Sequence, residues 1–239
     1  MTPSPLILHG TGFDPYYNLA VEEVLNAFCN GRKALYLWQN DRTVVVGRNQ
    51  DIVAEVDIPF AQANDITLTR RISGGGAVYH DKGNLNFTFA GSENETDVIV
   101  NAVSALGLEV ITTGRNDIEA VCGRTSAKFS GNAYYKSGAR SFHHGTILIN
   151  TDLAVMERVL TPDMAKLAGH GVASVRSRVI NLCEADPSLS VNDVKSAIIK
   201  AFEDKYGSAE TVDAGCLDAG EIEEARQRLV STEWIYGSK

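Results

Sequence analysis

Apolar side chains recur along the chain with two periods, one typical of helices and one typical of strands. In residues 14–28 they lie three or four positions apart, after an Asp-Pro pair that suits a helix start, which predicts a helix. Residues 34–38 and 43–46 are short, apolar and rich in aromatic or β-branched side chains, which predicts strands. Helical patterns also cover 51–64 with an interruption at Pro59, 97–106, 190–202 and 217–230.

Short strands separated by turns dominate residues 66–150. This arrangement favours an α+β fold with largely antiparallel mixed sheets flanked by helices, rather than a doubly wound parallel sheet. Neither an internal repeat nor a low-complexity linker interrupts the 239 residues. We therefore expect a single domain over 1–239, in which 185–239 forms a helical C-terminal part.

The composition of the chain argues against several kinds of partner and site. The formal net charge of −8 and the sequence pI of about 5.1 argue against nucleic acid as a partner, because nucleic-acid binding needs an excess of cations. The sequence has neither an apolar run long enough to span a membrane nor the start of a signal peptide. Its four cysteines are widely spaced, which indicates neither a zinc site nor a disulfide framework. We expect a cytoplasmic protein without a membrane partner.

The richest chemistry lies between residues 70 and 89. Three consecutive glycines, 74–76, permit positive φ angles and bring bare backbone N–H groups close to a ligand, as in nests that bind anionic oxygens. Arg70 and Arg71 precede this loop, and His80 and Lys82 follow it. A lone triple glycine is more often a flexible hairpin loop. The basic residues on both sides favour a site for a phosphate or carboxylate.

Two further segments carry candidate residues. Lys128 could be an ordinary surface lysine, and His143 and His144 should point to opposite faces of a strand, so they are poorly placed to share a metal. Arg176 and Arg178 lie in a Gly/Ser-rich segment. Either an anion-binding lid or structural salt bridges would explain this arginine pair.

The segment R-R-I-S-G-G-G-A-V-Y-H-D-K-G-N-L-N-F-T-F resembles the hallmark of A-type lipoate–protein ligases, within the biotin/lipoate ligase family. The similarity runs from about Phe13 to Leu182 and includes N-D-I, G-x-x-x-x-K-x-S-G and S-V-R-S-R-V-I-N-L in the family's order. It implies a catalytic domain of the class II synthetase-like fold, with ATP and Mg²⁺ as cofactors and lipoate as substrate.

The resemblance also implies individual roles. Lys128 would be the catalytic residue, Asp117 would contact the metal, and Arg48 would border the pocket. The residues expected to bind ATP or the acyl-adenylate are Arg71, Ser73, Gly75, Gly76, Ala77, Val78, Tyr79, His80, Asn84, Asn116, Asp117, Lys128, His144 and Thr146.

The activity so implied is the activation of lipoate to lipoyl-AMP and its transfer to a lysine of a lipoyl carrier domain. The carrier would be a 2-oxoacid dehydrogenase E2 protein, the glycine cleavage H protein or a similar protein. We expect the chain to lack the small C-terminal domain of longer ligases, so a separate accessory domain is a further expected partner in activation. Two alternatives stay open: a cysteine-dependent octanoyltransferase, for which Cys122 is poorly placed, and a lipoate-binding subunit that acts only in a complex.

Overall fold

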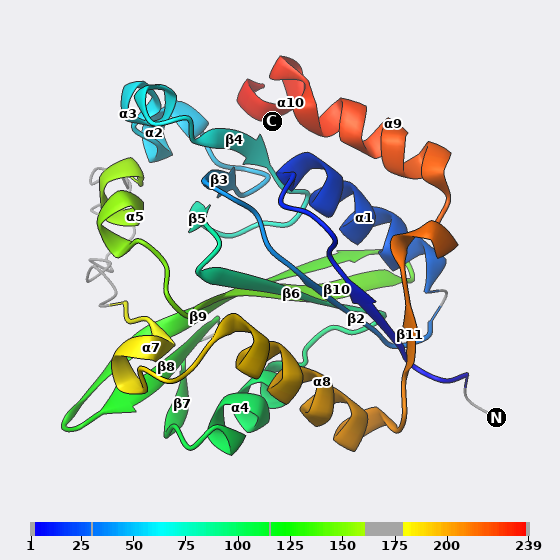
Figure 1. The fold of residues 1–239 in the computed structure, drawn as a ribbon. Coiled ribbons are helices and arrows are strands. Elements are labelled where there is room, and N and C mark those ends of the chain that lie inside the picture. The colour runs from blue at the N-terminus through cyan, green and yellow to red at the C-terminus, as the bar shows by residue number, and fades with distance from the viewer. Residues whose placement is uncertain (1–2, 30, 115, 161–178, 238–239) are drawn as a thin grey trace.

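The computed structural model describes residues 3–29, 31–114, 116–160 and 179–237 and contains two sheets (Figure 1). The strands of the larger sheet, in spatial order, are β11 (Glu210–Val212), β1 (Leu6–His9), β2 (Ala34–Trp38), β6 (Asn84–Ala90), β10 (Arg140–Leu148), β9 (Thr125–Ser137), β8 (Asp117–Cys122) and β7 (Val110–Thr113). Pairing is antiparallel from β2 to β7, whereas β1 runs parallel to both of its neighbours.

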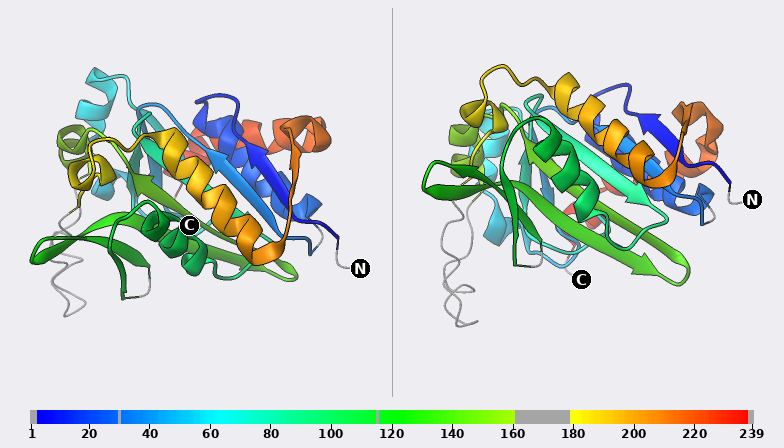
Figure 2. Two further views of the ribbon diagram at one scale, coloured as in Figure 1. Left: turned by 60° about the horizontal axis from the view of Figure 1, so that its bottom comes forward. Right: turned by 90° about the horizontal axis from the view of Figure 1, so that it is seen from below.

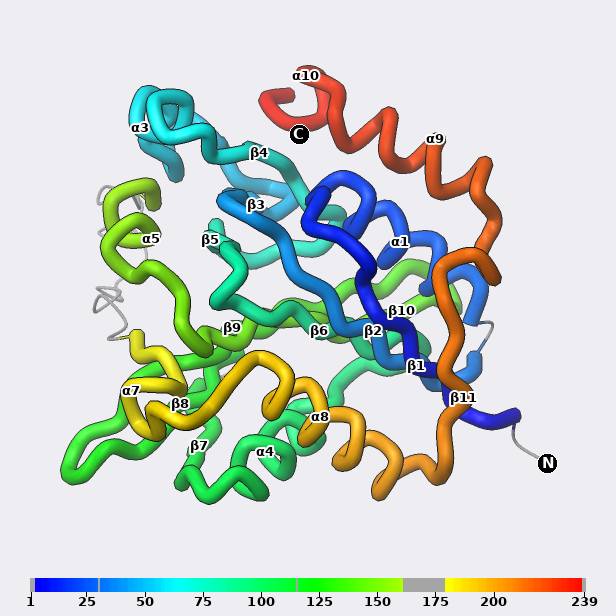
Figure 3. Tube along the Cα trace, in the orientation of Figure 1, coloured from blue at the N-terminus to red at the C-terminus, as the bar shows by residue number. Residues whose placement is uncertain are grey.

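The smaller sheet contains β4 (Thr67–Arg70), β3 (Thr43–Val46) and β5 (Val78–His80). Strand β3 pairs parallel with β4 and antiparallel with β5. Strand β4, residues 71–77, β5 and β6 follow one another along the chain, so the three glycines lie in a loop between two strands (Figure 3). The glycine loop therefore joins two strands of the small sheet, and the turn after β5 leads to β6 of the large sheet.

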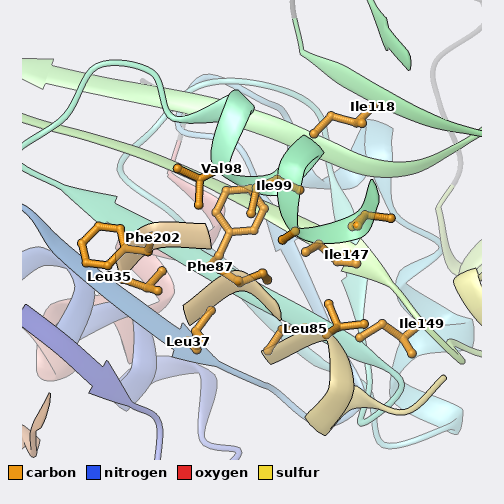
Figure 4. Packing of buried hydrophobic residues seen from close by; sticks show 14 of the residues in the cluster. Leu35, Leu37, Leu85, Phe87, Val98, Ile99, Ile118, Ile147, Ile149 and Phe202 are labelled. Atoms are coloured by element: carbon orange, nitrogen blue, oxygen red, sulfur yellow. The ribbon is translucent and has the colours of Figure 1, made fainter. Parts of the chain in front are cut away.

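Helices cover both faces of the large sheet (Figure 2). On one face, α1 (Pro15–Phe28) and α9 (Ala219–Val230) pack on β1 and β2. On the other face, α4 (Thr96–Ala105) and α8 (Val191–Tyr206) enclose the core shown in Figure 4. The other helical segments among the described residues are α2 (Ile52–Glu55), α3 (Ile58–Ala63), α5 (Leu153–Val159), α7 (Leu182–Ala185), η1 (Ala214–Cys216) and α10 (Thr232–Tyr236). This layering confirms the predicted α+β class.

Local sequence explains most helix boundaries. The Asp14 carboxylate accepts from the backbone of Tyr16 and Tyr17 at the start of α1, and Ser190 caps α8. The helical pattern over 51–64 is interrupted as predicted, but at Val56, where the chain is extended, and not at Pro59, which lies in the first turn of α3.

The C-terminal part, 185–239, contains a strand as well as the predicted helices. This strand, β11, pairs with β1 at the edge of the large sheet. The single helix predicted over 217–230 is followed by α10, and the two are separated by an extended Ser231 that caps the second helix. Within the described residues, no helix is long and apolar enough to cross a membrane.

Candidate active site

A cavity lies between the small sheet and strands β8, β9 and β10 of the large sheet. Most of the residues implied by the resemblance line it together: Arg71, Gly75, Gly76, Ala77, Val78, His80, Asn116, Asp117, Lys128, His144 and Thr146. These come from separate parts of the chain. The fold therefore gathers the glycine loop and the lysine segment, which the sequence identified independently, around one space.

Several lining residues were missed by the sequence analysis: Leu19, Trp38, Val45, Asn86, Gly131, Asn132, Ala133 and Gly145. Leu19, Trp38 and Val45 give part of the wall an apolar character. They were interpreted only as buried helix or strand positions, because a side chain that faces a cavity has the same local pattern as one that faces the core. Only the tertiary arrangement separates the two cases.

Arg71 holds the glycine loop from inside. Its Nε donates to the Ser73 hydroxyl at 3.0 Å, and its two terminal nitrogens donate to the carbonyls of Val45, Gly74 and Gly76 at 3.2, 2.6 and 2.9 Å. The side chain is buried, and burial lowers the pKa of the guanidinium to about 10. The loop carbonyls point toward this cation, and the cation is thus a structural part of the loop.

The middle glycine has a geometric requirement that its neighbours lack. Gly75 has a φ of 93°, in the left-handed region, and a Cβ placed there would lie 2.8 Å from a terminal nitrogen of Arg71. A Cβ at Gly74 or Gly76 would meet nothing within 4 Å. Three glycines are present, but the fold needs Gly75 for a distinct steric reason.

Arg70 and Lys82, which the sequence analysis grouped around the same concavity, lie elsewhere. Arg70 is buried and donates to the carbonyls of Gly47, Gln50 and Ile235, so it ties the end of α10 to the loop after β3. Lys82 is largely exposed and pairs with an aspartate on the surface. Neighbouring side chains on an extended backbone point to opposite sides, which separates Arg70 from Arg71.

Lys128 presents its ammonium to the cavity. Its Nζ lies 2.7 Å from Oδ1 of Asp117, and about a third of each side chain is exposed. Gly131 leaves the room that this placement needs, since a Cβ there would lie 3.1 Å from both Cε and Nζ of Lys128. The ammonium is therefore held by one carboxylate and stays accessible from the cavity.

Two histidines contribute imidazoles to the wall. Asn40 contacts Nδ1 of His80 at 3.1 Å, and among the residues described Nε2 of His80 has no partner. Burial, with the nearby charges of Arg71 and His144, lowers the pKa of His80 to about 3, so this ring is neutral at pH 7. With the Asn40 amide donating to Nδ1, the proton of His80 is on Nε2, a buried atom.

His144 links the glycine loop to helix α1. Its Nε2 lies 2.7 Å from the Ser73 hydroxyl, and its Nδ1 lies 2.7 Å from Glu22. Ser73, His144 and Glu22 are all buried. Because Ser73 also accepts from Arg71, it supports the loop and does not face the cavity.

Two more predicted residues lie behind the wall. Tyr79 is buried in the cluster of the small sheet, on the opposite side of β5 from Val78 and His80. Asn84 is buried and donates to Asn86, which does line the cavity. Arg48 is exposed, and its backbone N–H donates to the carbonyl of Ser73.

The predicted lid segment falls largely outside the described residues, as do its arginines Arg176 and Arg178. The four cysteines are all described, and none lines the cavity. Cys122 lies at the end of β8 and is partly exposed. A thiolate nucleophile in the cavity, as the octanoyltransferase alternative requires, has no counterpart here.

Comparisons with known proteins agree with this geometry. Residues 14–203 match the family of the lipoyl protein ligase A/B catalytic domain. A lipoate–protein ligase A from Bdellovibrio bacteriovorus is 37% identical over 236 residues, which cover 94% of this chain and 70% of that protein.

Solved structures of lipoate ligases share the fold. P. falciparum LipL1 in complex with lipoate superposes with a TM-score of 0.81 at 29% identity, over 98% of this chain and 74% of that one. A structure from work on the bipartite lipoate protein ligase of Thermoplasma acidophilum and its E2 lipoyl domain gives a TM-score of 0.81 at 26% identity, over 100% of this chain and 98% of that one. A lipoate–protein ligase A bound with ATP superposes with a TM-score of 0.76 at 25% identity, over the whole of both chains. This chain belongs to the lipoyl protein ligase A/B catalytic domain family, as its sequence motifs predicted.

Proposed function

We propose that this protein joins lipoate to a lysine of a lipoyl carrier domain in two steps within the cavity. In the first, the lipoate carboxylate attacks the α-phosphorus of ATP, which forms lipoyl-AMP and releases pyrophosphate. In the second, the lysine amine attacks the acyl carbon, and the bond to AMP breaks. The observation that carries the proposal is one cavity lined by both the glycine loop and the accessible ammonium of Lys128.

The glycine loop would bind the phosphates of the nucleotide. Its carbonyls are turned inward by Arg71, which supports an arrangement in which loop N–H groups face an anion. No carboxylate other than Asp117 lines the described cavity wall, so little opposes a negatively charged ligand. ATP bound to the ligase in a related structure is consistent with this assignment.

Lys128 would act on the reacting groups directly. An accessible ammonium can hold a carboxylate oxygen, offset negative charge that develops on the phosphoryl group, and later polarise the acyl carbonyl. A lysine suits this task because it is a compact charge on a flexible stem. Its contact with Asp117 keeps it oriented before the substrates bind.

Mg²⁺ fits the site as an ion held mainly by substrate. The described residues contain no group of three or more His, Cys, Asp or Glu that could hold a metal by themselves. Mg²⁺ bound to nucleotides commonly uses one or two carboxylates and takes its other ligands from phosphates and water. Asp117, with about a third of its side chain exposed, would supply the carboxylate, and the ion would neutralise phosphate charge.

The apolar part of the wall would take the hydrocarbon chain of lipoate. Leu19, Trp38 and Val45 lie on this side, and His80 offers the Nε2–H that has no described partner. A neutral imidazole can donate one hydrogen bond without placing a charge beside an apolar chain. The carrier would be an E2 or H-protein lipoyl domain, by analogy with the archaeal ligase and its E2 lipoyl domain.

Intact-mass analysis of a lipoyl carrier domain tests the proposal. The protein is incubated with the carrier and either lipoate plus Mg-ATP or preformed lipoyl-AMP. We expect a mass increase of one lipoyl group from lipoyl-AMP. Modification from both donors would show that activation needs no other protein, whereas modification from lipoyl-AMP alone would show that a separate accessory domain is required. No modification from either donor would contradict the proposal, and octanoyl carrier protein would be tested next.

A further inference from the structure

His143 lies on the opposite side of β10 from His144 and outside the cavity, yet it is joined to the cavity wall. The ring is fully buried. The backbone N–H of Glu95, just before α4, donates to its Nδ1 at 2.9 Å. Because Nδ1 accepts, the proton is on Nε2, which donates to Oδ1 of Asn132 at 2.8 Å. The structure thus fixes which nitrogen of this histidine carries hydrogen.

The next contacts lead to the candidate catalytic pair. Nδ2 of Asn132 donates to the carbonyl of Asn116 at 2.9 Å, and the backbone N–H of Asn132 donates to the same oxygen at 2.8 Å. Asn116 directly precedes Asp117, whose carboxylate lies 2.7 Å from Nζ of Lys128. Both asparagines line the cavity.

We propose that His143 is a positioning residue for the ligase reaction: acting through Asn132, it holds the backbone of Asn116 and so places Asp117 and Lys128. This inference rests on the function proposed above, in which Lys128 acts on the reacting groups. The imidazole orients the Asn132 amide, since only an amide with its oxygen toward His143 can turn its nitrogen toward Asn116.

The ring is suited to a fixed role. Burial, with the nearby His144, lowers the pKa of His143 to about 3, so it stays neutral at pH 7 and keeps one arrangement of its hydrogen bonds. Its ring also stacks on Tyr134, with centroids 4.7 Å apart. A purely structural role in this aromatic cluster is the competing explanation, and the two explanations make different predictions.

Two substitutions separate them, because each keeps one half of the imidazole's hydrogen bonding. In His143→Asn, the amide oxygen replaces Nδ1 and keeps the acceptor for Glu95, but the donor to Asn132 is lost. In His143→Gln, the amide nitrogen replaces Nε2 and keeps the donor to Asn132, but the acceptor for Glu95 is lost. Both variants lose the aromatic stacking, so each is a control for the other.

The experiment measures kcat and KM for carrier modification from saturating lipoyl-AMP, together with thermal unfolding. We expect His143→Asn to lower kcat about tenfold with KM changed less than about threefold, because misplacement of a catalytic group reduces the rate of the chemical step. His143→Gln should recover most of the wild-type kcat although it is equally or more destabilised. Equal kcat in the two variants, or activity that simply follows the unfolding temperature, would overturn the proposal.

A third variant, at Asn132, tests the inference if neither His143 variant folds. Asn132→Leu has nearly the same shape and removes the link from the cavity end, and we expect the same loss of kcat. A wild-type kcat in Asn132→Leu would overturn the inference. Since every variant is compared with wild-type protein on one donor, an inactive wild type would instead refute the proposed function together with this inference.

Discussion

Two cations border the cavity, and the structure uses them in opposite ways. Arg71 is buried, and its guanidinium donates to Ser73 and to loop carbonyls. Lys128 is about a third exposed and contacts the carboxylate of Asp117. The role of a basic residue near a site therefore depends on which groups its hydrogen-bond donors already bind. Arg71 acts through the loop, and Lys128 is available to the ligand.

Removal of Lys128 should have the largest effect on activity and a small effect on stability. In Lys128→Ala we expect carrier modification to fall by about 10²- to 10³-fold, since one preorganised electrostatic contact to the transition state is lost. The free energy of unfolding should change by less than about 1 kcal/mol, because the ion pair with Asp117 is partly exposed. Lys136→Ala, which removes an exposed lysine paired with Glu93, is the matched control and should keep wild-type activity. Near-normal turnover in Lys128→Ala would mean that this lysine is only a surface charge.

Removal of Arg71 should lower both stability and nucleotide affinity. Arg71→Ala empties a buried site and leaves the carbonyls of Val45, Gly74 and Gly76 without this donor, which should cost about 2 to 4 kcal/mol of unfolding free energy. The apparent affinity for ATP should fall because the loop loses its support. Chemical denaturation and calorimetric ATP titration measure the two effects. Unchanged ATP affinity would count against the glycine loop as the nucleotide site.

Alanine substitutions in the glycine loop should differ by position. Gly75→Ala places a methyl group at a positive φ and against Arg71, so we expect about 1 to 3 kcal/mol of destabilisation and weaker ATP binding. Gly74→Ala meets no atom within 4 Å and serves as the control. Equal behaviour of the two variants in thermal unfolding and ATP titration would contradict the assigned role of Gly75.

A smaller effect is expected from crowding Lys128. In Gly131→Ala the new methyl group would lie 3.1 Å from Cε and Nζ of Lys128, which must shift by a few tenths of an ångström. Since the lysine end is flexible, unfolding should change little, whereas kcat should fall by about threefold to tenfold. Kinetics with lipoyl-AMP at saturation would measure this, and Gly12→Ala, in open space, is the control. A rise in KM at constant kcat would place the effect on binding instead.

The smallest expected change is a pKa shift at His80. The charge of Arg71 helps to lower this pKa to about 3, after the larger effect of burial. In Arg71→Gln we expect the pKa of His80 to rise, because a nearby positive charge no longer opposes protonation, and to stay below 6.5, because the ring is still buried. NMR titration of the imidazole protons checks this. A similar rise in Lys128→Ala would show that the two cations are not distinguished as described.

Sequence patterns predicted much of the fold because helix starts and strand alternation are local. Asp14 and Ser190 begin helices as expected, and the glycine loop lies between strands. The interruption within 51–64 was predicted at Pro59 but lies at Val56, because a proline can stand in the first turn of a helix as well as break one.

The site was predicted where its residues share motifs, and missed where they do not. The glycine loop was identified from its glycines and the basic residues that flank it, and Lys128 through the family resemblance. Trp38 and Asn132 were not, because they approach the cavity from strands that only tertiary pairing brings together. Arg70 and Arg71 are indistinguishable in sequence, and their different roles depend on which way each side chain leaves the end of β4.

The most direct test of this account compares Lys128→Ala and Arg71→Ala in a single turnover. Each variant is used in excess over preformed lipoyl-AMP, at a concentration that binds all of the donor, and is mixed with the carrier domain. The rate constant of transfer is followed by intact mass. We expect the rate constant of transfer in Lys128→Ala to stay at least about a hundredfold below that of wild type when all lipoyl-AMP is bound, because a group that acts on the acyl carbonyl is missing. Arg71→Ala should recover most of the wild-type rate once its weaker binding is overcome. Rapid transfer by Lys128→Ala, with a persistent defect in Arg71→Ala, would contradict the assignment of the two cations.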